Sequence, residues 1–219
     1  MMTSIEKIIF AEFKKYGYEI IANHGTIVVL KHTDFIDFWV VCTKKFELSQ
    51  QHDIYESTVM SIAENYPYAP KNTSLLVLSD LTKEQLTSDE IVELEKDPFF
   101  FKKYVLPYSE ELSKMLQDLL LSKNANSISE LIMLPESFNA LIEEKTYGLY
   151  HLLYCIAHKL PFVPIKAEQK GLQQRDFCLS RCDEKTALDE VMSINGDLQD
   201  LYDQLKLKVE QECDEQYED

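Results

Sequence analysis

The chain has 219 residues, of which 45% are hydrophobic, and a formal net charge of −16 at pH 7. This length and apolar content are sufficient for a sizeable buried core, organised as one domain or two small ones. The acidic excess argues against nonspecific binding of nucleic acid phosphates over most of the surface, because such binding requires clustered lysine and arginine.

Two further features of composition indicate a cytoplasmic protein. No stretch approaches the roughly 20 apolar residues of a membrane span, and the first residues, MMTSIEKIIF, lack the apolar core of a signal peptide. The five cysteines are an odd number and are scattered, which indicates reduced thiols. Cys178 and Cys182 are the one close pair, without two more ligands at standard spacing. We therefore expect no metal site and no cofactor.

The first 80 residues predict a small mixed α/β subdomain. Apolar residues recur at helical spacing near the N-terminus, and alternating or continuous apolar segments follow, separated by turn residues such as His24 and Gly25. The expected order is α-β-β-β-α-β: a helix over 3–16, strands over 18–23, 26–32 and 34–43, a helix over 50–65 and a strand over 74–79.

The same order occurs in restriction-type nuclease cores, so a nuclease is the first enzymatic alternative. Such a site needs an aspartate and then an acid-x-Lys triplet on the next strand, because two carboxylates hold the metal and the lysine steadies the attacking water. The nearest match is Asp34 or Asp37 followed by Cys42-Thr43-Lys44, with cysteine in place of the second acid. A non-catalytic sheet is therefore favoured over a degenerate nuclease.

Other catalytic patterns are missing from the sequence. There is no glycine-rich phosphate loop, no G-x-S-x-G segment and no H-E-x-x-H segment. A cysteine nucleophile at Cys42 or Cys155 with a distant histidine has no support in the local sequence. We expect no catalytic residues.

From residue 81 onward the pattern becomes helical, so we expect an α+β protein with a helical subdomain over 81–219 after the subdomain over 1–80. The run over 136–159 is the strongest helical pattern and predicts a central buried helix. The other expected elements are short helices over 82–86 and 89–95, a helix that begins at Asp97 and Pro98 and ends near Pro107, helices over 109–122 and 128–134, and an extended segment over 160–165.

The last fifty residues contain a basic and then an acidic segment. Four basic residues over 166–181 fit an ordinary solvated segment, or a contact with phosphate or an acidic partner. Residues 183–219 carry 13 acidic residues and 3 lysines, and predict a long acidic helix. Leu198, Leu201 and Leu205 form part of an apolar stripe on it, which we expect to dock on the protein body or on a partner.

An aromatic block with two lysines lies near the middle of the chain, between Asp97 and Ser109. Three consecutive phenylalanines cannot all face one core from a helix, because successive positions point about 100° apart. Either the block is a buried joint between the subdomains, or one ring is left for a partner. The candidate partner-binding residues here are Phe99, Phe100, Phe101, Lys102, Lys103 and Tyr104.

The segment DPFFFKKYVLPYSEE over 97–111 resembles the D-P-aromatic-aromatic-F-basic-K-aromatic-V segment of the middle components of ABC-three-component systems, the Lamassu-type bacterial defence operons. The resemblance implies an accessory subunit without known chemistry of its own. It would join an SMC-like ATPase to an effector, commonly a nuclease, hold the effector inactive until activation, and contact DNA through these partners. The alternative is a stand-alone acidic binding or inhibitor protein, for instance a DNA mimic.

Overall fold

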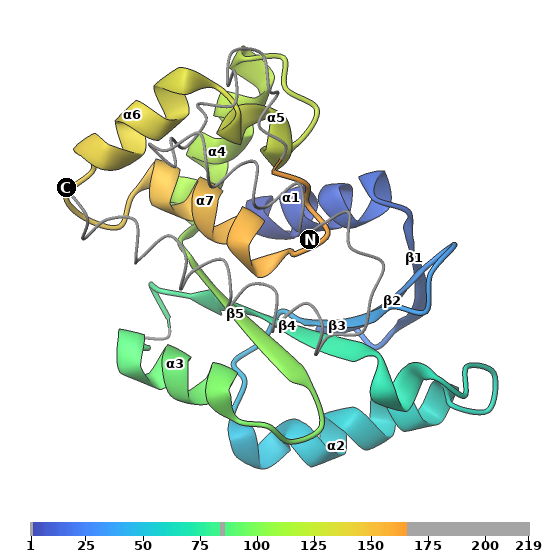
Figure 1. The fold of residues 1–219 in the computed structure, drawn as a ribbon. Coiled ribbons are helices and arrows are strands. Elements are labelled where there is room, and N and C mark those ends of the chain that lie inside the picture. The colour runs from blue at the N-terminus through green and yellow to red at the C-terminus, as the bar shows by residue number, and fades with distance from the viewer. Residues whose placement is uncertain (1, 84–85, 166–219) are drawn as a thin grey trace, which may run out of the picture. The chain divides into compact units, whose positions relative to one another are not determined.

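The computed structural model describes residues 2–83 and 86–165, in which a five-stranded sheet lies between two layers of helices (Figure 1). The strand order is β1-β2-β3-β4-β5. The first three strands pair antiparallel, whereas β3, β4 and β5 pair parallel. The strands are β1 (Tyr18–Asn23), β2 (Ile27–His32), β3 (Phe38–Cys42), β4 (Thr73–Asp80) and β5 (Lys102–Tyr108).

The helices cover both faces of the sheet. In Figure 1, α1, α4, α5 and α7 lie on one side of it, and α2 and α3 lie on the other. The helices are α1 (Ser4–Lys15), α2 (Gln51–Tyr55), which continues into a π-helical turn (Glu56–Met60), α3 (Ser88–Lys96), α4 (Glu110–Ser122), α5 (Ile128–Ile132), α6 (Pro135–Glu143) and α7 (Leu149–Lys159). None of the described helices is long and apolar enough to cross a membrane.

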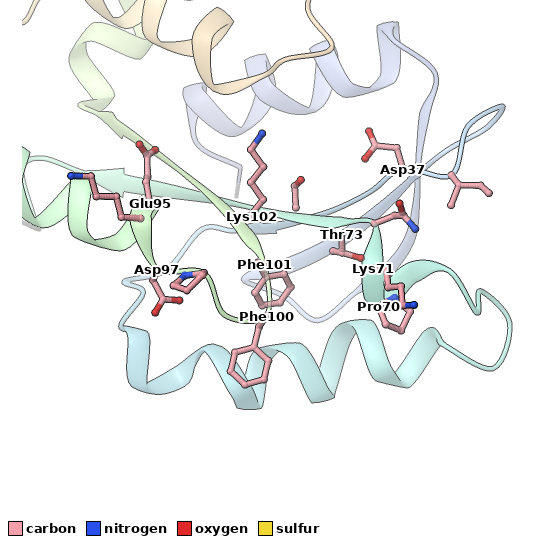
Figure 2. A pocket seen from close by; sticks show the side chains of 14 residues that line it. Asp37, Pro70, Lys71, Thr73, Glu95, Asp97, Phe100, Phe101 and Lys102 are labelled. Atoms are coloured by element: carbon pink, nitrogen blue, oxygen red, sulfur yellow. The ribbon is translucent and has the colours of Figure 1, made fainter. Parts of the chain in front are cut away.

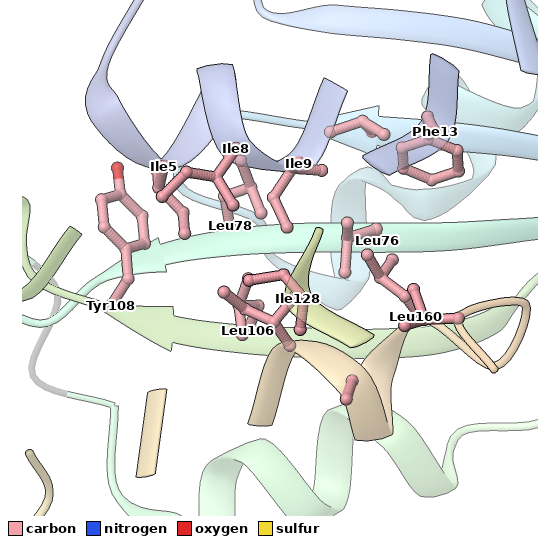
Figure 3. Close-up of a cluster of buried hydrophobic side chains, with 14 of the residues drawn as sticks. Ile5, Ile8, Ile9, Phe13, Leu76, Leu78, Leu106, Tyr108, Ile128 and Leu160 are labelled. Atoms are coloured by element: carbon pink, nitrogen blue, oxygen red, sulfur yellow. The ribbon is translucent and has the colours of Figure 1, made fainter. Parts of the chain in front are cut away.

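Successive side chains of each strand point to opposite faces of the sheet, so the apolar side chains form two cores. Leu76 and Leu78 of β4 face α1 and the C-terminal helices, whereas Leu75 and Val77 face α2 and α3. Figure 3 shows the first core, where α1 side chains such as Ile5 meet the sheet. The expected α+β class, with the sheet near the N-terminus and helices after it, is confirmed.

Three of the predicted helices begin at side-chain caps. Ser109 and Ser127 are the N-caps of α4 and α5, each accepting a backbone N–H three residues ahead. Thr3 forms a capping box with Glu6 at the start of α1. These starts depend on short-range hydrogen bonds, which is why the local sequence predicts them.

The predicted helix from Pro98 to near Pro107 is wrong, because this segment forms the fifth strand. Lys103 and Val105 face the α2–α3 side, while Tyr104, Leu106 and Tyr108 face the other, and Leu76 of β4 pairs with Tyr104. Aromatic and β-branched residues fit such a pleated, two-sided buried surface. Pairing with β4 therefore overrides the helix signal of the Asp-Pro start.

The outer edge of β5 is closed by side chains. Glu95 accepts the Val105 N–H at 2.7 Å and is itself held by Lys159 at 2.5 Å. Pro107 has no N–H to expose, and its carbonyl accepts the Tyr147 hydroxyl at 2.7 Å. These contacts prevent another strand from pairing with this edge.

The single helix predicted over 136–159 is also wrong, since it is broken into α6 and α7. The carboxylate of Glu144 caps α7 by accepting the N–H groups of Tyr150 (3.1 Å) and His151 (3.0 Å). A Cβ at Gly148 would lie 2.7 Å from this carboxylate, so the Glu144 side chain would have to shift if a larger residue stood there. The predicted burial applies to α7, whereas the only buried residue of α6 is Ser137.

Smaller differences concern segment ends. The third strand was expected over 34–43 but begins at Phe38, since 34–36 form an exposed bend. Residues 81–83, where a helix over 82–86 was expected, form a turn. The basic segment over 166–181 and the acidic segment over 183–219, with Leu198, Leu201 and Leu205, lie outside the described residues. The division at residue 80 stays a prediction.

Candidate protein-binding site

The residues Asp97–Phe101 form a tight loop between α3 and β5, which we call the aromatic loop. The Phe101 N–H donates to the Phe99 carbonyl at 2.7 Å, so Phe100 is the central residue of a γ-turn. Its φ of 61° lies in the left-handed region that non-glycine residues rarely adopt. Such a conformation persists only where the surroundings impose it, and it is concentrated at functional sites.

Lys103 holds the aromatic loop from inside. Its ammonium group donates to Asp97 Oδ1 at 2.5 Å, and to the carbonyls of Phe99 at 2.7 Å and Asp97 at 3.2 Å. The Lys103 side chain is fully buried, and its hydrogen bond to Asp97 is the main cause that lowers the pKa of that carboxyl. A buried cation with this many acceptors fixes the path of the loop.

The three phenylalanines have different surroundings. Phe101 is 4% exposed and packs in the core against the Tyr55 ring, with centroids 5.4 Å apart. Phe99 is 61% exposed and Phe100 is 40% exposed. The Phe100 ring packs against the rings of His52 and Tyr55 of α2, both with centroid distances of 5.4 Å. Figure 2 shows the Phe100 ring beside this helix. The aromatic loop thus presents two rings to solvent and anchors itself with the third.

The two neighbouring lysines lie on opposite faces of β5. Whereas Lys103 is buried, Lys102 is exposed, with its ammonium group 5.2 Å from the centroid of the Tyr104 ring. Tyr104 in turn stacks on Trp39, with centroids 5.2 Å apart. Figure 2 shows Lys102 pointing away from the side on which Phe100 lies.

A pocket of about 540 Å³ lies beside the aromatic loop, at the N-terminal ends of β3, β4 and β5 (Figure 2). We call it the β3–β5 pocket. Its lining includes three exposed lysines, Lys71, Lys96 and Lys102, together with Asp37, Glu95 and Asp97. Two of these acids are neutralised, Glu95 by Lys159 and Asp97 by Lys103. Among the described residues, no acid forms an ion pair with any of the three lysines.

Asp37 forms hydrogen bonds that stabilise the fold, and it does not lie next to Cys42, which replaces the second acid in the nuclease alternative. Its Oδ2 accepts hydrogen bonds from the Trp39 indole N–H, at 3.2 Å, and from the Tyr18 hydroxyl. Burial of Tyr18 and its hydrogen bond to Asp37 raise the pKa of Tyr18. Cys42 lies at the other end of β3, roughly 16 Å away at the rise of an extended strand, with its side chain in the core. Residues 2–83 and 86–165 contain no group of three potential metal-binding side chains.

The two cysteines of the nucleophile alternative lie in surroundings that do not favour a reactive thiolate. Cys42 is fully buried, and its sulfur donates to the Lys44 carbonyl at 3.5 Å. Burial raises the pKa of Cys155, which disfavours the thiolate that a nucleophile requires. The Nδ1 of His151 lies 2.8 Å from Glu144, so this ring belongs to the α7 cap.

The residues brought together here are only partly those expected from the sequence. All six aromatic-block candidates lie at or next to the loop, but Lys71, Lys96 and Ile36 were not anticipated, because they come from other elements. Their contribution depends on the parallel pairing of β3, β4 and β5, which places three strand starts side by side.

The middle of the chain is similar to a protein family. Residues 37–144 match the family described as ABC-three component (ABC-3C) system Middle Component 1. The matched range includes the aromatic loop, β5 and nearly all of the β3–β5 pocket lining. Neither the curated proteins nor the solved structures gave a match to this chain.

Proposed function

We propose that this chain is a middle component of an ABC-three component system and acts there as an accessory subunit without catalytic chemistry of its own. The family match over residues 37–144 supports this assignment. In the finer proposal, which follows the Lamassu-type resemblance, the subunit joins an SMC-like ATPase to an effector in the cytoplasm. The effector is commonly a nuclease, and the subunit holds it inactive until activation.

The observation that carries the proposal is the exposure of Phe99 and Phe100 on a loop that is fixed from within. Binding hot spots are commonly large aromatic side chains surrounded by polar groups. A loop that is already ordered loses little further conformational freedom when a partner binds. The buried Lys103 and the γ-turn supply this order. We therefore assign the two exposed rings as the anchors for a partner subunit.

A second contact is proposed for the acidic C-terminal segment. Leu198, Leu201 and Leu205 recur at helical spacing, which a purely polar spacer would not need. The negative charge of this segment would attract a basic partner surface and increase the rate of association. Deletion of 197–219 is expected to weaken complex formation.

The experiment is co-purification of the tagged chain with the products of neighbouring genes. We expect an ATPase and an effector to be retained, and Phe99→Ala or Phe100→Ala to weaken retention by about 2 kcal/mol or more. Phe138→Ala on α6 is a matched control, because this ring is 55% exposed but lies on the other side of the sheet (Figure 1). A chain that purifies without any partner would instead favour the stand-alone acidic binding protein.

A further inference from the structure

The β3–β5 pocket is a positively charged site in an acidic protein. Its three lysines come from three separate segments: Lys71 precedes β4, Lys96 ends α3 and Lys102 begins β5. Glu95 and Asp97 each have a lysine partner at 2.5 Å, so their charges are already compensated. The whole chain nevertheless carries a net charge of −16. A local positive charge on such a chain marks the place where an acidic group is attracted most strongly.

The lining of the same pocket also includes apolar side chains. Ile36 is 57% exposed and Phe100 is 40% exposed, and both line the pocket. Pro70, Pro98 and Phe101 complete the apolar part of the lining, and neither proline donates a backbone hydrogen bond. Aliphatic and aromatic walls beside charged groups suit a ligand that is partly apolar and partly charged.

We propose that the β3–β5 pocket binds an acidic segment of a partner protein, with an apolar side chain against Ile36 and Phe100 and carboxylates near Lys71, Lys96 and Lys102. The inference rests on the proposed function only in taking the source of the segment to be a partner subunit. It explains why an exposed ring and the exposed lysine of the aromatic block, Phe100 and Lys102, line one pocket.

Nucleic acid fits this pocket less well than an acidic protein segment does. A phosphate backbone carries charge at every nucleotide and has no aliphatic side chain to place against Ile36. Asp37 also lines the pocket, and it would repel a continuous run of phosphates. A peptide can place its acids near the lysines and a polar or apolar residue near Asp37.

The test uses the full chain and two fluorescent peptides. One alternates glutamate with phenylalanine and leucine, and the other has glutamine at every glutamate. Fluorescence anisotropy should show binding of the glutamate peptide, weaker binding at high salt, and little binding of the glutamine peptide. The affinity for the glutamate peptide should fall by about tenfold in each of the variants Lys71→Glu, Lys96→Glu and Lys102→Glu. The proposal would be overturned if the two peptides bound with equal affinity, or if neither of them bound.

Lys114→Glu is the matched control. Lys114 is exposed on α4, and its replacement changes the net charge by the same amount without touching the pocket. If this variant lost as much affinity for the glutamate peptide as the pocket variants do, the loss would come from the net charge of the whole protein, and the proposal would fail. Thermal melting of all four variants should match the unsubstituted chain, because each lysine is exposed.

Two further outcomes separate the pocket from its surroundings. A single-stranded oligonucleotide that binds more tightly than the glutamate peptide, and is lost in Lys102→Glu, would identify a nucleic acid site and overturn the proposal. If the glutamate peptide binds as expected but no neighbouring gene product co-purifies, the pocket assignment is supported and the proposed function fails. If partners co-purify and the pocket variants retain them normally with unchanged peptide binding, the pocket assignment fails alone.

Discussion

The ammonium group of Lys103 lies 2.5 Å from a carboxylate oxygen of Asp97, inside the aromatic loop, while the adjacent Lys102 points to solvent on the other face of β5. Two identical neighbours in one motif therefore have different tasks. Lys103 maintains the loop, and Lys102 is available for a ligand of the β3–β5 pocket.

The first prediction follows from this division. Lys103→Met should lower the free energy of unfolding by about 3 kcal/mol, because it leaves a carboxylate and buried carbonyls without their donor. Lys102→Met, the same replacement one residue earlier, should change it by less than about 0.5 kcal/mol. Urea denaturation measures both. Similar losses for the two variants would show that Lys103 does not organise the loop.

A second prediction concerns the backbone of Phe100. Phe100→Ala and Phe100→Gly remove the same ring contacts with His52 and Tyr55. Only glycine adopts the φ of 61° without strain, so the glycine variant should be the more stable by about 1 kcal/mol. The comparison is made by thermal or chemical denaturation. An alanine variant as stable as the glycine variant would mean that this φ carries no strain.

The third prediction separates Phe101 from its neighbours. Phe101→Ala should cost about 3 kcal/mol or more in stability, because its ring is buried between β5 and α2. Phe99→Ala should leave the unfolding midpoint nearly unchanged, since its ring is 61% exposed. A large loss of stability in Phe99→Ala would show that this ring stabilises the fold.

The fourth prediction concerns Glu12, a buried carboxyl on α1. One of its oxygens accepts the Ile128 N–H at 2.9 Å, while the other is buried and has no partner in the described structure. Desolvation raises the pKa of Glu12 above its ordinary 4.5, so the folded state favours the protonated form. The contribution of Glu12 to stability should therefore increase as the pH falls from neutral through this raised pKa.

The measurement is the difference in unfolding free energy between the unsubstituted chain and Glu12→Gln at a series of pH values. Because glutamine does not titrate, the unsubstituted chain should gain stability relative to the variant as the pH decreases toward 4.5. A difference that stays constant with pH would contradict the raised pKa.

The fifth prediction concerns the start of α7. Gly148→Ala should destabilise the protein by about 1 kcal/mol or more, because the new Cβ displaces the Glu144 carboxylate from the N–H groups of Tyr150 and His151. In a Glu144→Ala background, the same glycine replacement should cost much less. Additive effects in this double-mutant cycle would rule out the steric explanation.

Local sequence was enough for the elements whose signals act over a few residues. Apolar spacing predicted α1, helical patterns over 109–122 and 128–134 predicted α4 and α5, and the turn at Gly25 predicted the first hairpin. The aromatic block was also recognised as the distinctive segment. Hydrogen bonds over three or four residues determine such features, so neighbouring residues contain the information.

Only the tertiary structure decided which residues of that block pack and which face solvent. The segment is a strand because β4 offers a parallel neighbour, and a strand turns Lys102 and Lys103 to opposite faces. Three identical phenylalanines contain no signal to distinguish one buried ring from two exposed ones. The burial of Phe101 beside Tyr55, and the meeting of Lys71, Lys96 and Lys102 at one pocket, come from contacts between segments far apart in the chain, whose free energies exceed local preferences.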